Sequence, residues 1–305
     1  MSELHPKLIE WKTNGEMKPV LSGSFEVFCR QIGNPNADSE HTALILHGFP
    51  ESSFSYHSVI EGLKTFFDRI ILFDFLGFGQ SDKPIKHHYN IIEQAQIALN
   101  VWQSYGVKGG HLIAHDMGDS VAAELITLSN NKKTGDGFRN DLQSVTFTNG
   151  GMVIELAQLR ILQKLMLNPI LGPLLSKLSR YKVFKQQVFS ANGNKSLAES
   201  DIEIMWLAFR SGNGNKIGHK LIQYINDRYR YQNSRWLPAL KETTIPIHLC
   251  WGELDAVAPI AIAEKLMKDI CPKATFTRMD NTGHFCQMDN PDKWIESVLN
   301  YYRVN

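Results

Sequence analysis

The chain has 305 residues, 43% of them hydrophobic and 21% charged, which is enough for one large domain with an insertion and a sizeable core. Its 32 Lys and Arg side chains nearly balance its 31 Asp and Glu side chains, giving a formal charge of +1. This balance argues against nucleic acid or an anionic membrane as a partner. No segment reaches the roughly 18 uninterrupted apolar residues that a membrane span needs.

The first 149 residues alternate short apolar runs with helical patterns, as a parallel sheet requires. We expect strands at residues 25–31, 43–47, 69–74, 112–115 and 144–148. From about residue 150 to residue 236 the strand patterns stop and helical periodicity takes over. Strand and helix patterns resume with strands at residues 244–252 and 274–279, followed by a helix at residues 292–303.

This division predicts a core in two parts, residues 1–149 and 241–305, with an all-helical insert at residues 150–240 after the sixth strand. We call this insert the cap, because we expect it to cover the carboxyl edge of the sheet. Its apolar run at residues 154–178 should pack against the core, broken by Pro169 and Pro173. Glycines at residues 135–137 and 212–215 predict loops.

The four cysteines, Cys29, Cys250, Cys271 and Cys286, are scattered and form no C-x-x-C pair. This spacing favours reduced thiols over disulfides or a zinc site, so we expect a cytoplasmic protein with no metal and no cofactor. The first residues carry charges and no apolar stretch, so we expect no signal peptide.

The strongest chemical signal is the turn Ala114-His115-Asp116-Met117-Gly118, which lies between a strand-like run and a helical pattern. This order predicts a nucleophile elbow, a strained turn flanked by small residues that holds one side chain exposed. Unlike a serine, the Asp116 carboxylate is ionised at pH 7 without a base. It can therefore displace a leaving group at saturated carbon and form an ester that water hydrolyses. Taken alone, Asp116 is also a reasonable helix N-cap.

Ester hydrolysis needs a histidine to activate water, a carboxylate to orient the histidine, and amide donors for the oxyanion. Asp255 follows the strand that ends near Gly252, and His284 lies in a glycine-containing loop after the last strand. Taken singly, Asp255 is more often a turn former and His284 a structural histidine. Their order along the chain favours the catalytic interpretation.

The oxyanion donors come from two turns that follow strands. The apolar run at residues 43–46 leads directly into His47-Gly48-Phe49-Pro50. We expect the backbone amides of Phe49 and Met117 to face each other and bind the oxyanion.

Together these motifs resemble the α/β-hydrolase superfamily, in the branch that holds epoxide hydrolases and haloalkane dehalogenases. The resemblance rests on HGFPES (residues 47–52), DFLGFGQSDKP (residues 74–84), the Asp116 elbow, GELDAVAP (residues 252–259) and TGHF (residues 282–285). It implies an α/β class fold, with a mostly parallel sheet flanked by helices and a helical cap after the sixth strand. It also implies a catalytic triad of Asp116, His284 and Asp255.

Two further points follow from the resemblance. Residues 148–152 and 221–227 are similar to the mesoderm-specific transcript family, which supplies no substrate to carry over. Asp119 departs from the small residue that the superfamily usually has there, and we expect it to face the N-terminus of the helix, where a negative charge is favourable.

The leaving group is the open question. Dehalogenases of this branch bind the halide with side-chain donors, usually a Trp just after the nucleophile and an Asn or Trp elsewhere. Here Phe49 and Met117 occupy the two motif positions, and neither side chain donates a hydrogen bond. Epoxide hydrolases use cap tyrosines to donate to the ring oxygen. Tyr224 matches the second of these tyrosines, and Tyr181 is a looser match for the first; both also fit a simple packing role.

We therefore expect a hydrolase that acts on a small apolar organic substrate and water, first of all an epoxide hydrolase with a covalent alkyl-enzyme ester. One alternative is a haloalkane dehalogenase with halide donors in the cap, among which Trp206 is a candidate. The other is a non-catalytic protein that retains the hydrolase shell. We expect no nucleic-acid partner and either a monomer or a homodimer.

Overall fold

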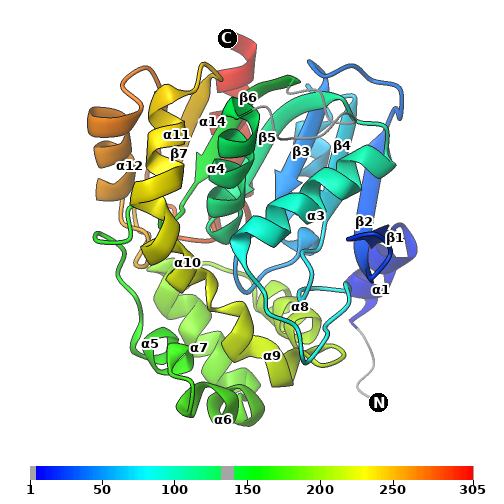
Figure 1. The fold of residues 1–305 in the computed structure, drawn as a ribbon, viewed down its shortest axis with the longest axis vertical. Coiled ribbons are helices and arrows are strands. Elements are labelled where there is room, and N and C mark those ends of the chain that lie inside the picture. Colours follow the sequence, from blue (N-terminus) through cyan, green and yellow to red (C-terminus); the bar gives the residue numbers. More distant parts are fainter. Residues whose placement is uncertain (1–4, 132–140, 305) are drawn as a thin grey trace.

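A computed structural model describes residues 5–131 and 141–304. The loop expected at residues 135–137 lies outside these ranges. An eight-stranded sheet with the strand order β1-β2-β4-β3-β5-β6-β7-β8 runs through the molecule (Figure 1). β2 pairs antiparallel with β1 and β4, and the remaining neighbours are parallel. The strands are Glu16–Val20 (β1), Phe25–Gly33 (β2), Thr42–Leu46 (β3), Arg69–Phe73 (β4), Gly109–His115 (β5), Asp141–Thr148 (β6), Ile247–Gly252 (β7) and Thr275–Met279 (β8). The chain thus has the α/β-hydrolase fold.

All the strands expected from the sequence are present, with ends shifted by no more than three residues. β1 was not expected. It lies at the edge of the sheet and has mostly exposed or half-buried side chains, so its sequence carries little apolar signal.

The central strands are buried on both faces, as is usual where helices cover a parallel sheet. Successive side chains point to opposite faces. Leu44 and Leu46 of β3 therefore join one hydrophobic cluster, whereas Ala43 and Ile45 join a second. The core helices are α1 (Pro6–Thr13), α2 (Ile60–Leu63), α3 (Ile91–Ser104), α4 (Met117–Asn130), α12 (Ala261–Lys265), α13 (Cys286–Asp289) and α14 (Pro291–Val304).

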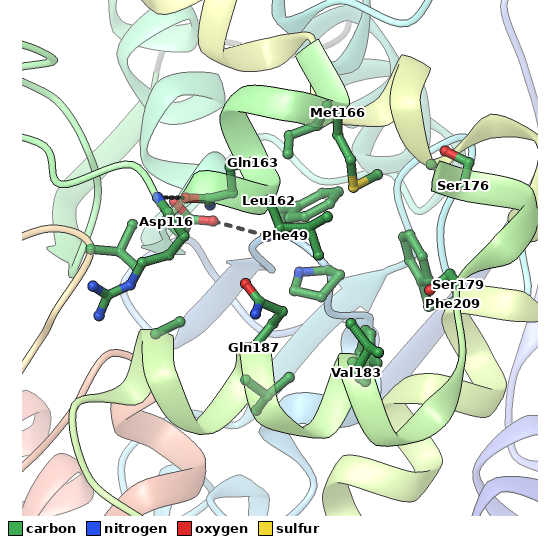
Figure 2. A pocket seen from close by; sticks show the side chains of 18 of the residues that line it. Phe49, Asp116, Leu162, Gln163, Met166, Ser176, Ser179, Val183, Gln187 and Phe209 are labelled. Atoms are coloured by element: carbon green, nitrogen blue, oxygen red, sulfur yellow. Dashed lines mark hydrogen bonds between the residues drawn. The ribbon is translucent and has the colours of Figure 1, made fainter. Parts of the chain in front are cut away.

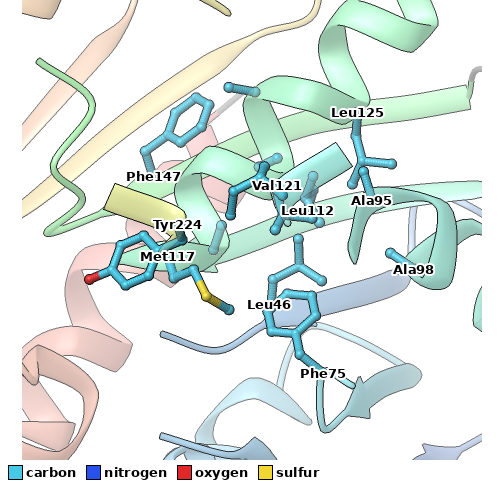
Figure 3. Close-up of a cluster of buried hydrophobic side chains, with 14 of the residues drawn as sticks. Leu46, Phe75, Ala95, Ala98, Leu112, Met117, Val121, Leu125, Phe147 and Tyr224 are labelled. Carbon is cyan, nitrogen blue, oxygen red and sulfur yellow. The ribbon is translucent and has the colours of Figure 1, made fainter. Parts of the chain in front are cut away.

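Helices α3 and α4 pack on the first face, and α1, α2 and α14 contribute to the cluster on the second face. Figure 3 shows the first cluster, in which Leu46 and Leu112 of the sheet lie close to Val121 and Leu125 of α4. The same cluster includes Tyr224 of the cap, so the cap and the core share one continuous apolar interior.

Seven cap helices of the described chain lie between β6 and β7. They are α5 (Ile161–Leu167), α6 (Leu171–Leu178), α7 (Tyr181–Asn192), α8 (Glu199–Arg210), α9 (Gly214–Leu221), α10 (Tyr224–Tyr231) and α11 (Leu237–Glu242), with a π-helical turn at Gln232–Trp236. Helices α5 to α9 gather at one end of the molecule, and α10 leads back to α11, which packs on α4 of the core (Figure 1). Pro169 separates α5 from α6, as expected. The break expected at Pro173 is wrong, because Pro173 lies in the first turn of α6, where its missing N–H costs nothing.

The expectation that the apolar run packs against the core holds for one side of α5, where Met166 and Leu167 pack against the first cluster, although no residue of α5 is fully buried. α6 buries only Gly172 and Ser176, and it packs against α9 and α5 within the cap. Periodicity predicts an apolar stripe but does not say what covers it.

Two buried contacts join the cap to the core. The Lys83 ammonium donates to the Ala208 carbonyl (3.1 Å) and the Ser211 hydroxyl (2.7 Å) at the end of α8. Burial lowers the pKa of Lys83 to about 8. Asp227 of α10 accepts the Ile91 amide of α3 at 2.9 Å. These contacts join α8 and α10 of the cap to the core.

All four cysteines are buried and free. Within residues 5–131 and 141–304, no helix combines the length and the apolar character needed to cross a bilayer.

Candidate active site

Asp116 lies in the turn between β5 and α4 and has a backbone φ of 48° and ψ of −104°. This is a sparsely populated conformation for a residue with a side chain, as a nucleophile elbow requires. Position 118 has room only for a glycine, because a Cβ there would lie 2.7 Å from the Leu46 carbonyl and 2.9 Å from the His47 carbonyl. The local geometry therefore matches the predicted elbow.

The turn after β3 brings backbone donors to Asp116. The Phe49 amide donates to Asp116 Oδ2 at 3.1 Å. Met117 is the first residue of α4, so its amide has no acceptor within the helix. A Cβ on Gly48 would lie 2.8 Å from Asp116 Cβ, and glycine therefore lets the two turns approach. The two predicted amides lie on the turns that meet at Asp116.

His284 and Asp255 form a buried pair. His284 Nδ1 lies 2.8 Å from Asp255 Oδ2. The Val257 and Ala258 amides donate to Asp255 Oδ1 at 2.7 and 2.8 Å, and Asn149 Nδ2 donates to Oδ2 at 2.7 Å. These donors fix the orientation of the Asp255 carboxyl, which in turn orients the His284 ring through Nδ1.

The buried charges in the site act on one another. Burial lowers the pKa of His284, but Asp255, Asp116 and Glu51 together raise it to about 9. Burial also disfavours ionised Asp116, yet Arg228 and His284 hold the pKa of that carboxyl below its usual value. Asp116 is therefore a carboxylate at neutral pH, which is the form that a nucleophile needs.

Arg228 was missed in the sequence. Its guanidinium donates to the Asp116 carbonyl at 2.7 Å, to Asp116 Oδ1 at 3.2 Å and to the Ser120 hydroxyl at 2.9 Å. Arg228 lies four residues after Tyr224 on α10, and its guanidinium stacks 4.7 Å from the centre of the tyrosine ring. The i, i+4 spacing was the available signal, because it puts both side chains on one helix face.

The predicted tyrosines lie in different places. The Tyr224 hydroxyl shares side-chain hydrogen bonds with Asp116 and Arg228; burial and Asp116 raise its pKa, so it is protonated. Tyr181 packs with its ring 6.3 Å from that of Trp206, and neither residue lines the cavity above Asp116. The structure thus brings Tyr224, but not Tyr181 or Trp206, to the site.

A cavity of about 100 Å³ lies between the cap and Asp116. Its floor carries Asp116, His284 and Tyr224, and α5, α6 and α7 form much of its wall (Figure 2). The wall is mostly apolar, with polar side chains contributed by Arg160, Gln163, Ser176, Ser179 and Gln187. This lining fits a small apolar molecule that carries few polar atoms.

Two more buried carboxyls lie close to the floor. Asp119 lies in the first turn of α4, as expected, and its carboxyl accepts the Thr148 amide of β6 at 3.3 Å; burial raises its pKa well above the usual value. Glu51 accepts the Gly48 amide at 2.9 Å and the Gln287 side chain at 2.7 Å. Burial raises the pKa of Glu51 to about 8, so this carboxyl is mostly neutral at pH 7.

Comparison with known proteins agrees with the fold. The family model described as "alpha/beta hydrolase fold" matches residues 44–126. The human mesoderm-specific transcript homolog protein is 33% identical over 98% of this chain and 89% of its own length. A putative hydrolase, LipZ, of Mycobacterium tuberculosis is 32% identical over 96% of this chain and 97% of its own.

Solved structures agree on the fold. The haloalkane dehalogenase DbeA of Bradyrhizobium elkanii superposes with a TM-score of 0.76 at 19% identity, over 95% of this chain and 97% of its own. The epoxide hydrolase CorEH superposes with a TM-score of 0.72 at 19% identity, over 95% and 98%. The chain therefore belongs to the α/β-hydrolase family and is related along almost its whole length to the mesoderm-specific transcript proteins.

Proposed function

We propose that this hydrolase opens epoxides through a covalent ester on Asp116. The observation that carries the proposal is the setting of the Asp116 carboxylate. One oxygen accepts the Phe49 amide, and the Tyr224 hydroxyl lies within hydrogen-bonding range of the same carboxylate. A nucleophile and a neutral proton donor thus share the floor of an apolar cavity.

In the first step, Asp116 Oδ1 attacks a ring carbon of the epoxide. The carbon–oxygen bond of the ring breaks, its electron pair goes to the ring oxygen, and the Tyr224 hydroxyl gives that oxygen a proton. An alkoxide is strongly basic, so this proton transfer supports the step. Arg228 keeps Asp116 ionised before the attack.

In the second step, His284 takes a proton from water, and the resulting hydroxide adds to the ester carbonyl. The Phe49 and Met117 amides hold the oxyanion. Collapse of this intermediate regenerates the Asp116 carboxylate and releases the diol, and the proton on His284 restores the Tyr224 hydroxyl. Asp255 holds His284 in the required tautomer throughout.

A haloalkane dehalogenase is the second candidate, because proteins of both kinds share the fold. Halide release needs donors at the leaving group, since a desolvated anion is costly. Among the described lining residues there is no tryptophan, and Trp206 instead packs 5.1 Å from the ring of Phe184. This arrangement favours the epoxide.

The test compares a terminal aliphatic epoxide with the bromoalkane of the same chain length. We expect faster diol formation than bromide release. A single turnover in ¹⁸O-labelled water should give a diol without the label and put the label into the peptide that carries Asp116. Faster bromide release would favour the dehalogenase. A labelled first-turnover diol would contradict the ester, and inactivity on both substrates with no adduct would favour the non-catalytic alternative.

A further inference from the structure

The cap carries an unusual concentration of exposed apolar side chains. Eight of the fourteen large exposed apolar residues in the described ranges lie within residues 156–183. Ile161 and Ile170 are the most exposed of these eight residues, with 78% and 81% of their surface exposed. We call the six residues Ile161, Leu165, Ile170, Leu171, Leu174 and Leu178 the apolar apex. They lie on α5, on α6 and in the connection between them, at the end of the molecule far from α14 (Figure 1).

The orientation of α6 places its small residues toward the rest of the cap and its leucines toward the outside. Gly172 and Ser176 face α9, where Ser176 Oγ accepts the His219 amide at 2.7 Å and a Cβ on Gly172 would lie 2.9 Å from His219 Cβ. Leu171, Leu174 and Leu178 form the i, i+3, i+7 stripe on the exposed side of the same helix. Such a stripe normally faces a core. Here small and polar residues make the internal contact, and the leucines face outward.

The charges along the segment that carries the apolar apex all have one sign. Residues 156–198 contain seven Lys and Arg residues and no Asp or Glu, so this segment carries a formal charge of +7 in a chain whose total is +1. Lys164, Lys177, Arg180 and Lys182 are exposed beside the apex. Lys182 and Lys185 also line a surface hollow of about 660 Å³ on the flank of α7. The net charge of the whole chain is therefore close to zero although the cap is strongly basic.

We infer that the apolar apex and its surrounding basic residues bind the surface of a bilayer that contains anionic phospholipid. Apolar side chains enter the acyl boundary while the ammonium and guanidinium groups meet the headgroups, which is how amphipathic helices lie in a membrane interface. A second copy of this chain fits the face poorly. A two-fold contact would place the same basic segments opposite each other.

The same helices connect this face to the cavity. Leu162 and Met166 of α5 line the cavity above Asp116, whereas Ile161 and Leu165 of α5 belong to the apolar apex. A bilayer bound at the apex would therefore lie one helix away from the site. This inference goes beyond the proposed function, and membrane binding is measured without any substrate.

The test is co-sedimentation of the full chain with phosphatidylcholine vesicles, with and without phosphatidylserine. We expect binding to the phosphatidylserine vesicles that weakens at high salt. The double variant Ile161→Asp/Ile170→Asp should lower the affinity by about tenfold or more, because two apolar side chains no longer enter the membrane. The matched control Ile9→Asp/Val304→Asp changes two exposed apolar residues outside the cap and should bind like the wild type.

Charge reversal gives an independent arm. Lys177→Glu/Lys182→Glu should lower the affinity for phosphatidylserine vesicles by about tenfold and leave the weak binding to pure phosphatidylcholine unchanged. If the Ile9→Asp/Val304→Asp control loses as much vesicle binding as the Ile161→Asp/Ile170→Asp variant, the inference is wrong. Absence of binding by the wild type, or a dimer in vesicle-free solution that the Ile161→Asp/Ile170→Asp variant breaks, would also overturn it.

Discussion

The carboxyl edge of the sheet and the cap place their functional residues by different means. At the edge, each of Asp116, Asp255 and His284 lies in a turn or loop that follows a strand. The Phe49 amide donates to the Asp116 carboxylate, and the Val257 amide donates to the Asp255 carboxyl.

In the cap, Tyr224 and Arg228 reach the same point from one face of α10, which side-chain hydrogen bonds of Asp227 and Arg228 join to the core. In the proposed mechanism, the edge supplies a nucleophile and a base, whereas the cap supplies a proton donor and a counter-charge.

This contrast predicts that mutations in the two regions lower activity in different ways. A change at the edge should stop a chemical step, because no other group carries the missing electron pair. A change in the cap should alter how well a particular leaving group departs. The four predictions below test this division, from the largest expected effect to the smallest.

Asp116→Asn should lower turnover by roughly 10⁴-fold or more, since a neutral amide does not attack carbon. Initial rates of diol formation measure the loss, and mass spectrometry of the Asp116 peptide detects slow recovery by deamidation. Asp119→Asn is the matched control: Asp119 is buried three residues away and does not line the cavity, and burial raises its pKa, so its variant should keep most of the activity. Full initial activity in Asp116→Asn would remove Asp116 from the mechanism.

His284→Gln should block only the second step, because attack by Asp116 needs no base. After incubation with a substrate, the peptide that carries Asp116 should gain the mass of the alkyl group, while steady-state turnover falls by on the order of 10³-fold. The structural control is His248→Gln, at a buried histidine on β7 away from the cavity. Continued turnover without a modified peptide would contradict the two-step scheme.

Tyr224→Phe should lower epoxide turnover by about 100-fold and leave any haloalkane activity nearly unchanged, because a halide leaves as a stable anion. Tyr181→Phe serves as the control, since Tyr181 does not line the cavity. The measurement is kcat on the matched epoxide and bromoalkane. An equal loss on both substrates would show that Tyr224 positions Asp116 rather than protonating a leaving group.

Glu51→Gln should change kcat at pH 7 by less than about threefold, because Glu51 is already mostly neutral there. Its effect on stability should depend on pH. The pKa of Glu51 is raised to about 8 in the fold, so the wild type loses stability as the pH rises from the unfolded pKa near 4.5 to about 8. The Tm advantage of the variant should therefore grow over this range to about 5 °C and level off above it. A constant difference in Tm between pH 5 and pH 9 would contradict the raised pKa.

The sequence allowed prediction of the sheet and of the Asp116 turn because both depend on local patterns. An apolar strand followed by small residues and a helical pattern has few alternatives, and the structure gives Asp116 the strained backbone that this pattern implies. The role of Asp116 in catalysis stays a prediction.

The positions of the cap side chains could not be predicted, because their contacts are made between segments that are distant in the sequence. Tyr181 and Tyr224 are equally reasonable as aromatic residues on amphipathic helices, and only the packing of α7 and α10 separates them. Arg228 carries no motif of its own. The leucines of α6 obey a periodicity that is the same whether a core, a partner or a membrane covers them.

One consequence of the charge network concerns timing. Asp116 is among the anions that raise the pKa of His284 to about 9, so His284 holds a proton while the carboxylate is free. Forming an ester on Asp116 removes that anion, and the imidazole then releases its proton more readily. In the proposed reaction, ester formation therefore favours the neutral imidazole that the second step needs, and the returning carboxylate raises the pKa of His284 again.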